Sequence, residues 1–119
     1  MEMAESVLLE KSKDLAVEVV LLCRTIAAEH REYILTKQLT RAITSVGANL
    51  HESKYARGRV DFGNKMQIAL KECYESEYWL ELLHRCGFIE KERYEALRNQ
   101  CGQIRRMLIA SINTLEKKQ

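Results

Sequence analysis

Proline is absent from this chain of 119 residues, and glycine occurs only five times. Because proline breaks helices and glycine weakens them, this scarcity favours long, uninterrupted helices. Aromatic residues make up only 7% of the chain and β-branched residues do not alternate with polar ones, which argues against a sheet protein. The sequence therefore predicts an all-α protein, and its length predicts a single domain over residues 1–119.

Neither a charge excess nor a long apolar run is present. The formal net charge is +2, which is too small to indicate a nucleic-acid-binding protein by itself, so only a local patch could do so. The N-terminus has no basic segment followed by an apolar core, and no apolar run approaches the roughly 20 residues that span a bilayer. We expect a cytoplasmic protein without a membrane partner.

The four cysteines do not form closely spaced pairs. They are Cys23, Cys73, Cys86 and Cys101, and none belongs to a C-x-x-C motif. A structural zinc site needs ligand pairs at short spacing. Three of the four fall on or beside apolar helix positions, so we expect reduced, buried thiols that act as small hydrophobic residues in a cytosolic protein.

Four segments repeat apolar residues at helical spacing, and we expect helices at about residues 6–28, 35–55, 61–86 and 90–115. Thr36 and Asp61 are expected helix N-caps, and Gly58 and Gly87 are expected helix stops. Short connections make successive helices antiparallel neighbours, which predicts an up-down-up-down four-helix bundle. The inward residues of the four helices are expected to be Leu15, Val19, Leu22 and Ile26; Leu39, Ile43, Val46 and Leu50; Phe62, Met66, Ala69, Cys73, Ser76, Leu80 and Leu83; and Tyr94, Leu97, Cys101, Ile104, Leu108 and Leu115.

Some apolar residues exceed what one bundle core needs. Because monomers rarely expose large apolar patches, the first and fourth helices are expected to form the interface of a homo-oligomer. The candidate interface residues are Val17, Val20, Leu21, Ile109 and Ile112. Gly47 lies inside the second helix, where glycine costs about 1 kcal/mol relative to alanine. It either allows a close backbone contact or is simply tolerated.

A second, polar stripe runs beside the apolar stripe of the second and third helices. If the chain turns at residues 57–59, Glu52 faces Lys65, Ser45 faces Glu72, and Arg41 faces Ser76 and Glu75. Each carboxylate then meets a cation or a hydroxyl, so we predict a polar seam that fixes the register of this helical hairpin. Its members are Arg41, Ser45, Asn49, Glu52, Lys65, Glu72 and Glu75.

Motifs for catalysis or cofactor binding are weak. Di-iron bundles need a Glu-x-x-His motif on two helices, and only Glu81 and His84 form one here. Ser45 and Ser76 lack a histidine at a suitable helical spacing, and no glycine-rich phosphate loop is present. We therefore expect no enzyme activity, no catalytic residues, no metal and no cofactor.

The connector between the second and third helices carries local positive charge. Lys54, Arg57 and Arg59 surround Tyr55, and three cations beside an aromatic ring could hold a phosphate backbone. An isolated cluster of this kind is more often a solvated turn. Repetition around an oligomer would add several weak patches together, which favours nucleic-acid binding.

The middle of the chain resembles a bacterial family of four-helix-bundle proteins that are encoded in intervening sequences of 23S ribosomal RNA genes. The resemblance covers about residues 8–115 and is carried by LTKQLTRAITSVGANLHES, starting at Leu35, and DFGNKMQIALKECYESEYWLELLHRCGFI, starting at Asp61. The matching positions are Gln38, Arg41, Ser45, Gly47, Asn49, Glu52, Asp61, Phe62, Lys65, Ala69, Glu72, Glu75, Tyr78, Trp79 and Leu80.

The resemblance implies a left-handed bundle, a pentamer and no enzymatic activity. The same family includes the accessory variability determinant of diversity-generating retroelements, which forms a barrel-like pentamer and binds a reverse transcriptase and nucleic acid. We therefore expect a homo-oligomeric accessory factor that binds RNA or a ribonucleoprotein. The alternative is an oligomeric scaffold or adaptor that binds proteins and no nucleic acid.

Overall fold

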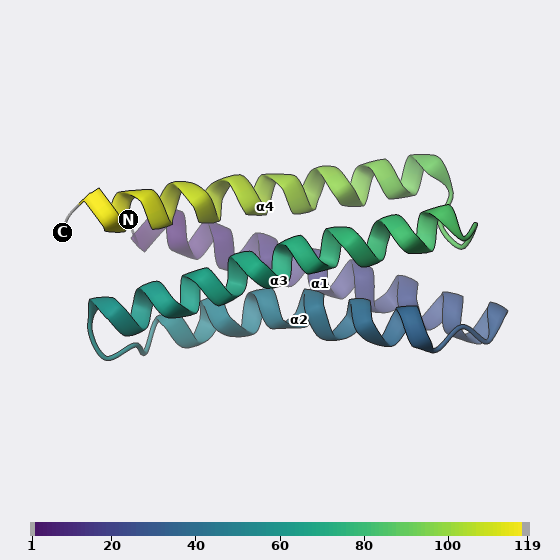
Figure 1. Ribbon diagram of the computed structural model, residues 1–119, viewed down its shortest axis with the longest axis horizontal. Coiled ribbons are helices and arrows are strands. Elements are labelled where there is room, and N and C mark those ends of the chain that lie inside the picture. Colours follow the sequence, from purple (N-terminus) through teal and green to yellow (C-terminus); the bar gives the residue numbers. More distant parts are fainter. Residues whose placement is uncertain (1, 118–119) are drawn as a thin grey trace.

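The computed structural model describes residues 2–117, which form four antiparallel helices (Figure 1). Helix α1 spans Glu2–His30, α2 spans Ile34–Ser53, α3 spans Arg59–Arg85 and α4 spans Lys91–Lys117. Each helix packs against its neighbours along the chain, and α1 also packs against α4. The prediction of an all-α, up-down bundle is confirmed. Its left-handed sense stays a prediction.

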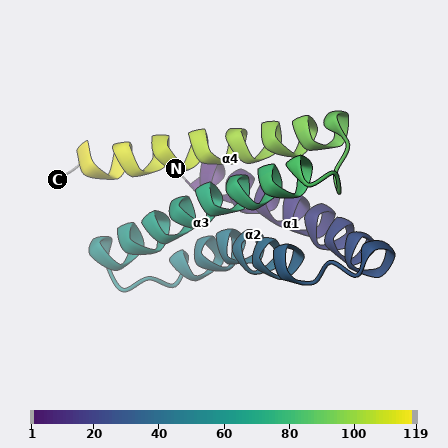
Figure 2. The same ribbon diagram turned by 45° about the vertical axis from the view of Figure 1, so that its right-hand side comes forward.

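The bundle is elongated, with extents of 48 × 23 × 19 Å. The start of α1, the end of α4 and the α2–α3 turn lie at one end, and the other two connections lie at the opposite end (Figures 1 and 2). None of the helices that the structure describes is long and apolar enough to cross a membrane.

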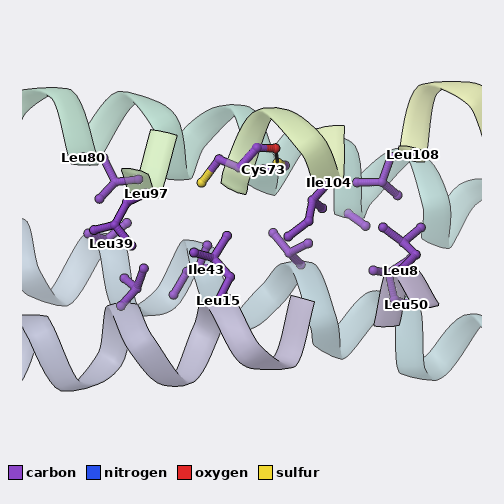
Figure 3. Packing of buried hydrophobic residues seen from close by; sticks show 14 of the residues in the cluster. Leu8, Leu15, Leu39, Ile43, Leu50, Cys73, Leu80, Leu97, Ile104 and Leu108 are labelled. Carbon is purple, nitrogen blue, oxygen red and sulfur yellow. Dashed lines mark hydrogen bonds between the residues drawn. The ribbon is translucent and has the colours of Figure 1, made fainter. Parts of the chain in front are cut away.

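A leucine-rich core runs along the bundle axis, with side chains from all four helices meeting between the ribbons (Figure 3). Nearly all of the predicted inward residues are buried, whereas Leu22 and Phe62 are only partly buried. The core also contains Leu8, Leu9 and Ile89, which the predicted stripes missed. Two of these lie on α1, which begins about one turn earlier than the sequence indicated.

The N-terminus of α2 is capped by a glutamate. The Glu32 carboxylate accepts hydrogen bonds from the backbone N–H groups of Ile34, Leu35 and Thr36, at 3.2, 2.8 and 2.9 Å. Thr36 instead donates its hydroxyl to the carbonyl of Glu32, at 2.8 Å. The prediction of Thr36 as N-cap is therefore wrong, because a longer side chain four residues earlier satisfies the free N–H groups.

The α2–α3 turn also differs from the prediction. Helix α2 ends at Ser53, and Gly58 directly precedes α3 with φ 89° and ψ −178°, a conformation that is essentially restricted to glycine. Asp61 lies in the first turn of α3 instead of capping it, and its carboxylate accepts the backbone N–H of Arg57 at 3.0 Å. Gly58 is thus the N-cap of α3 and does not terminate α2.

The end of α3 agrees with the sequence. Gly87 has φ 86° and donates its N–H to the carbonyl of His84, at 2.9 Å, while Phe88 donates to Leu83, also at 2.9 Å. This pair of bonds is a Schellman motif, which satisfies the last carbonyls of the helix and requires a left-handed residue at the position of Gly87.

Candidate functional site

The polar seam between α2 and α3 is present. One guanidinium, that of Arg41 on α2, pairs with two carboxylates of α3: its Nη1 lies 3.2 Å from Glu72 Oε2, and its Nη2 bonds Glu75 Oε2. The indole N–H of Trp79 donates to the same Glu75 oxygen at 3.2 Å. The Arg41–Glu75 prediction is confirmed, whereas Glu72 pairs with Arg41 and not with the predicted Ser45.

Nearer the turn, the Lys65 ammonium lies 2.8 Å from Glu52 Oε1, as the predicted register requires. The hydrogen bond and the charge of Glu52 raise the pKa of Lys65. Asn49 uses its amide within α2, donating to the carbonyl of Ser45 at 2.8 Å. The seam is therefore two separate ion-pair groups that cross-link α2 and α3.

The cationic turn lies at the end of the bundle that also holds both ends of the described chain. Lys54, Arg57 and Arg59 are exposed, and the Tyr55 ring is 75% exposed. Lys54 and Arg59 also line a shallow groove of about 410 Å³, together with Phe62 and residues from the outer ends of α1 and α4. Lys54 and Arg59 thus share one surface, and Arg57 is exposed on the same turn.

The predicted oligomer interface is only partly on the surface. Val17 and Leu21 on α1 are 60% and 53% exposed, and Val20 and Ile109 are partly buried. Ile112 is only 7% exposed and belongs to the core of a single chain, so the prediction that it is surplus is wrong. Because α4 extends to Lys117, Ile112 lies about one turn inside the end of the bundle and not at a free edge.

Val17 borders an apolar groove of about 530 Å³ between α1 and α2. Small residues form its floor, namely Ala16, Gly47 and Ala48. A Cβ atom placed on Gly47 would lie 3.8 Å from Ser12 Cβ, which is ordinary van der Waals contact. Within one chain, Gly47 is therefore tolerated and is not required by a close backbone approach.

Farther along the same two helices is a second groove, of about 640 Å³, that the sequence analysis missed. It is flanked by cations from both helices, Arg24 on α1 and Lys37 and Arg41 on α2, with Tyr33 at its end. An antiparallel turn between α1 and α2 pairs the second half of α1 with the first half of α2, just as the α2–α3 turn pairs α2 with α3. This pairing brings Arg24 and Lys37 to one surface.

Redox and metal chemistry find little support in the described residues. Burial raises the pKa of the Cys73 thiol to about 12 and raises the pKa of Cys101 further, while Cys86 is exposed. Glu81 pairs with Arg85 at 2.9 Å, and His84 donates to the carbonyl of Ile89 at 2.8 Å and stacks on Tyr94. Within residues 2–117, no group of three potential ligands is arranged to hold a metal ion.

The chain was compared with known proteins. The family model of the 23S rRNA-intervening sequence protein matches residues 4–110. A crystal structure of a protein with unknown function from the S23 ribosomal protein family of Bacteroides thetaiotaomicron is 43% identical and superimposes with a TM-score of 0.90. That match covers 92% of this chain and 98% of the other. No curated protein matches the chain.

Proposed function

Because the chain belongs to the 23S rRNA-intervening sequence protein family, we propose that it is a non-enzymatic, homo-oligomeric accessory protein that binds RNA. The observation that carries this proposal is the exposed α2–α3 turn with Lys54, Arg57 and Arg59 around Tyr55. Cations that project from a rigid bundle end can reach phosphate groups, and an exposed tyrosine ring can stack on an unpaired base.

The charges around this turn favour an external anion. Among residues 2–117, the side chains of Lys54 and Arg57 make no ion pair. Two nearby carboxylates have other partners, since Asp61 accepts the N–H of Arg57 and Glu52 pairs with Lys65, whereas Glu5 lines the same groove as Lys54 and Arg59. The turn is thus a local positive surface on a chain whose net charge is only +2. Such a surface contacts phosphates without reading base sequence.

Oligomerisation is the second part of the proposal. Val17 and Leu21 are exposed on α1, and Val17 borders the groove floored by Ala16, Gly47 and Ala48. An apolar patch beside small residues allows a helix of another copy to approach closely. A pentamer is the state that the family resemblance suggests, and it would repeat the cationic turn five times and strengthen weak phosphate contacts. A cytoplasmic location fits the free cysteines.

Binding of structured RNA and single-stranded RNA, measured by fluorescence anisotropy between 50 and 200 mM salt, tests the proposal. Replacing Lys54, Arg57 and Arg59 with alanine should weaken binding to all sequences alike. The slope of log affinity against log salt should fall by about two to three, roughly 0.7–0.9 for each lost phosphate contact. The matched control replaces three exposed cations outside the turn, Lys71, Lys91 and Arg106.

The control variant should keep most of the affinity. If the wild-type protein binds no RNA even at 50 mM salt, or if the two triple variants behave alike, the RNA-binding proposal fails. The oligomeric protein-binding scaffold would then be the better description.

A further inference from the structure

The second groove between α1 and α2 has the volume of a small-molecule site. Its volume of about 640 Å³ lies within the roughly 300–1,000 Å³ that is typical of ligand pockets. It lies at the opposite end of the bundle from the cationic turn, beside the α1–α2 connection. A ligand in this groove would therefore not compete directly with RNA bound at the turn.

The sides of the groove are positively charged. Arg24 projects from α1, and Lys37 and Arg41 project from α2 on the other side. Arg41 is neutralised by Glu72 and Glu75, but Arg24 and Lys37 have no ion-pair partner within residues 2–117. No carboxylate lines the groove in the part of the chain that the structure describes. An anion placed between the two helices would therefore meet two cations that make no ion pair with the described residues.

The nearby acidic residue Glu32 stays ionised and its charge reaches Cys23 in the groove, but its carboxylate does not line the groove. The carboxylate of Glu32 is held by three backbone N–H groups at the start of α2. Partial burial alone would raise the pKa of Glu32, but these hydrogen bonds outweigh it and lower the pKa. Because the same bonds occupy the N–H groups of the helix terminus, the side chains of Arg24 and Lys37 are what remains to bind an anion.

The floor of the groove is apolar. Val20, Cys23 and Ala27 come from α1, and the Cys23 thiol stays neutral because burial, with the charge of Glu32, raises its pKa. The Tyr33 ring is 62% exposed at the end of the groove. An inorganic anion would use only the cations, whereas a ligand with a flat apolar ring could also cover the floor and stack on Tyr33.

We propose that this groove binds a nucleoside 5′-phosphate, with its phosphate between Arg24 and Lys37 and its base over the apolar floor beside Tyr33. The nucleotide can be free or can be the 5′-terminal residue of an RNA strand, because both present the same phosphate and base. The proposal is independent of RNA binding at the α2–α3 turn, since the two sites share no residue.

Isothermal titration of the full chain with AMP, GMP, adenosine and inorganic phosphate tests the site. AMP or GMP should bind at least about tenfold more tightly than adenosine or phosphate alone, because only a nucleotide uses both halves of the groove. The double variant Arg24→Gln/Lys37→Gln should lose about tenfold or more in nucleotide affinity, and Tyr33→Ala about fivefold or more. Lys71→Gln/Lys91→Gln is the matched control and should bind like wild type.

Two further measurements separate the possible sources of the ligand and the two proposed sites. A 5′-phosphorylated oligonucleotide should bind more tightly than its 5′-hydroxyl counterpart if the terminal nucleotide enters the groove; equal affinities together with AMP binding would assign the site to free nucleotide. The variant lacking Lys54, Arg57 and Arg59 should keep full AMP affinity, so a failure of RNA binding at the turn leaves this result unchanged.

Backbone amide chemical shifts of the wild-type protein give a reading that does not depend on any variant. Titration with AMP should shift the amides of residues 20–27 and 33–41 and leave those of residues 54–62 in place. The proposal is overturned if AMP binds no more tightly than phosphate, if the Arg24/Lys37 variant binds it normally, or if the shifts cluster elsewhere.

Discussion

Arg41 holds two carboxylates of α3 with one guanidinium, and this bridge is the main polar cross-link between α2 and α3. Glu72 is largely buried, with a side chain 13% exposed, so loss of Arg41 would leave it without a counter-charge. We expect Arg41→Ala to lower the free energy of unfolding by about 1–2 kcal/mol, more than an ordinary surface pair contributes. Arg41→Lys should recover only part of this loss, because an ammonium lacks the planar fork that bridges two carboxylates.

Chemical denaturation monitored by circular dichroism checks this expectation. The exposed Glu10–Lys13 pair on α1 supplies the control, since both side chains are more than half exposed. Lys13→Ala should change stability by less than about 0.5 kcal/mol. Equal losses from Arg41→Ala and Lys13→Ala would show that the bridge contributes no more than a surface contact.

The four cysteines should differ sharply in reactivity. The thiolate is the nucleophile, and burial raises the pKa of Cys73 to about 12, so this thiol remains protonated at pH 8. Cys86 is exposed, while Cys23 and Cys101 are also buried with raised pKa values. We expect iodoacetamide at pH 8 to add one label, at Cys86, to the native protein and four labels after unfolding. Mass spectrometry of digested peptides measures this, and rapid native labelling of Cys73 would contradict it.

Among the structural elements, Gly47 inside α2 and Gly58 directly before α3 should respond in opposite ways to alanine. Gly58 is the N-cap of α3 at φ 89° and ψ −178°, where a side chain is strained, so Gly58→Ala should destabilise the fold by about 1–3 kcal/mol. A Cβ atom added to Gly47 inside α2 would lie 3.8 Å from the Ser12 side chain, so Gly47→Ala should stabilise a single chain by up to about 1 kcal/mol. Thermal unfolding of both variants tests this; a destabilising Gly47→Ala would indicate a tight contact there.

The sequence predicted the helices and their faces well because apolar spacing records which side of a helix is buried. The same spacing could not predict the helix starts. Glu32, four residues before Thr36, satisfies the N–H groups of α2, and Gly58 precedes α3 three residues before the expected cap Asp61. Pairing across the α2–α3 turn was predictable because opposite charges lay at equal distances from it. The groove with Arg24 and Lys37 was not predicted because these cations have no opposite charge across the α1–α2 connection that would reveal their pairing.

At the scale of the whole molecule, the two ends of the bundle present different cationic surfaces. One end carries the α2–α3 turn, and the other carries the groove with Arg24 and Lys37. The apolar residues Val17 and Leu21 lie between them, on the middle of α1. Contact between copies through the middle of α1 would therefore leave the turn of each copy accessible.

The assembly itself gives the last prediction. Val17 and Leu21 are more than half exposed in a single chain, so replacing both with glutamate should cost the isolated fold little but should place charge in an apolar interface. We expect multi-angle light scattering at micromolar concentration to show an oligomer for wild type and a monomer for Val17→Glu/Leu21→Glu, with unchanged helical content. Ile34→Glu/Val60→Glu, which alters two residues 76% and 74% exposed, should remain oligomeric. A monomeric wild-type protein would remove the repetition of the cationic turn on which RNA affinity is expected to depend, and RNA binding should then be weak even at low salt.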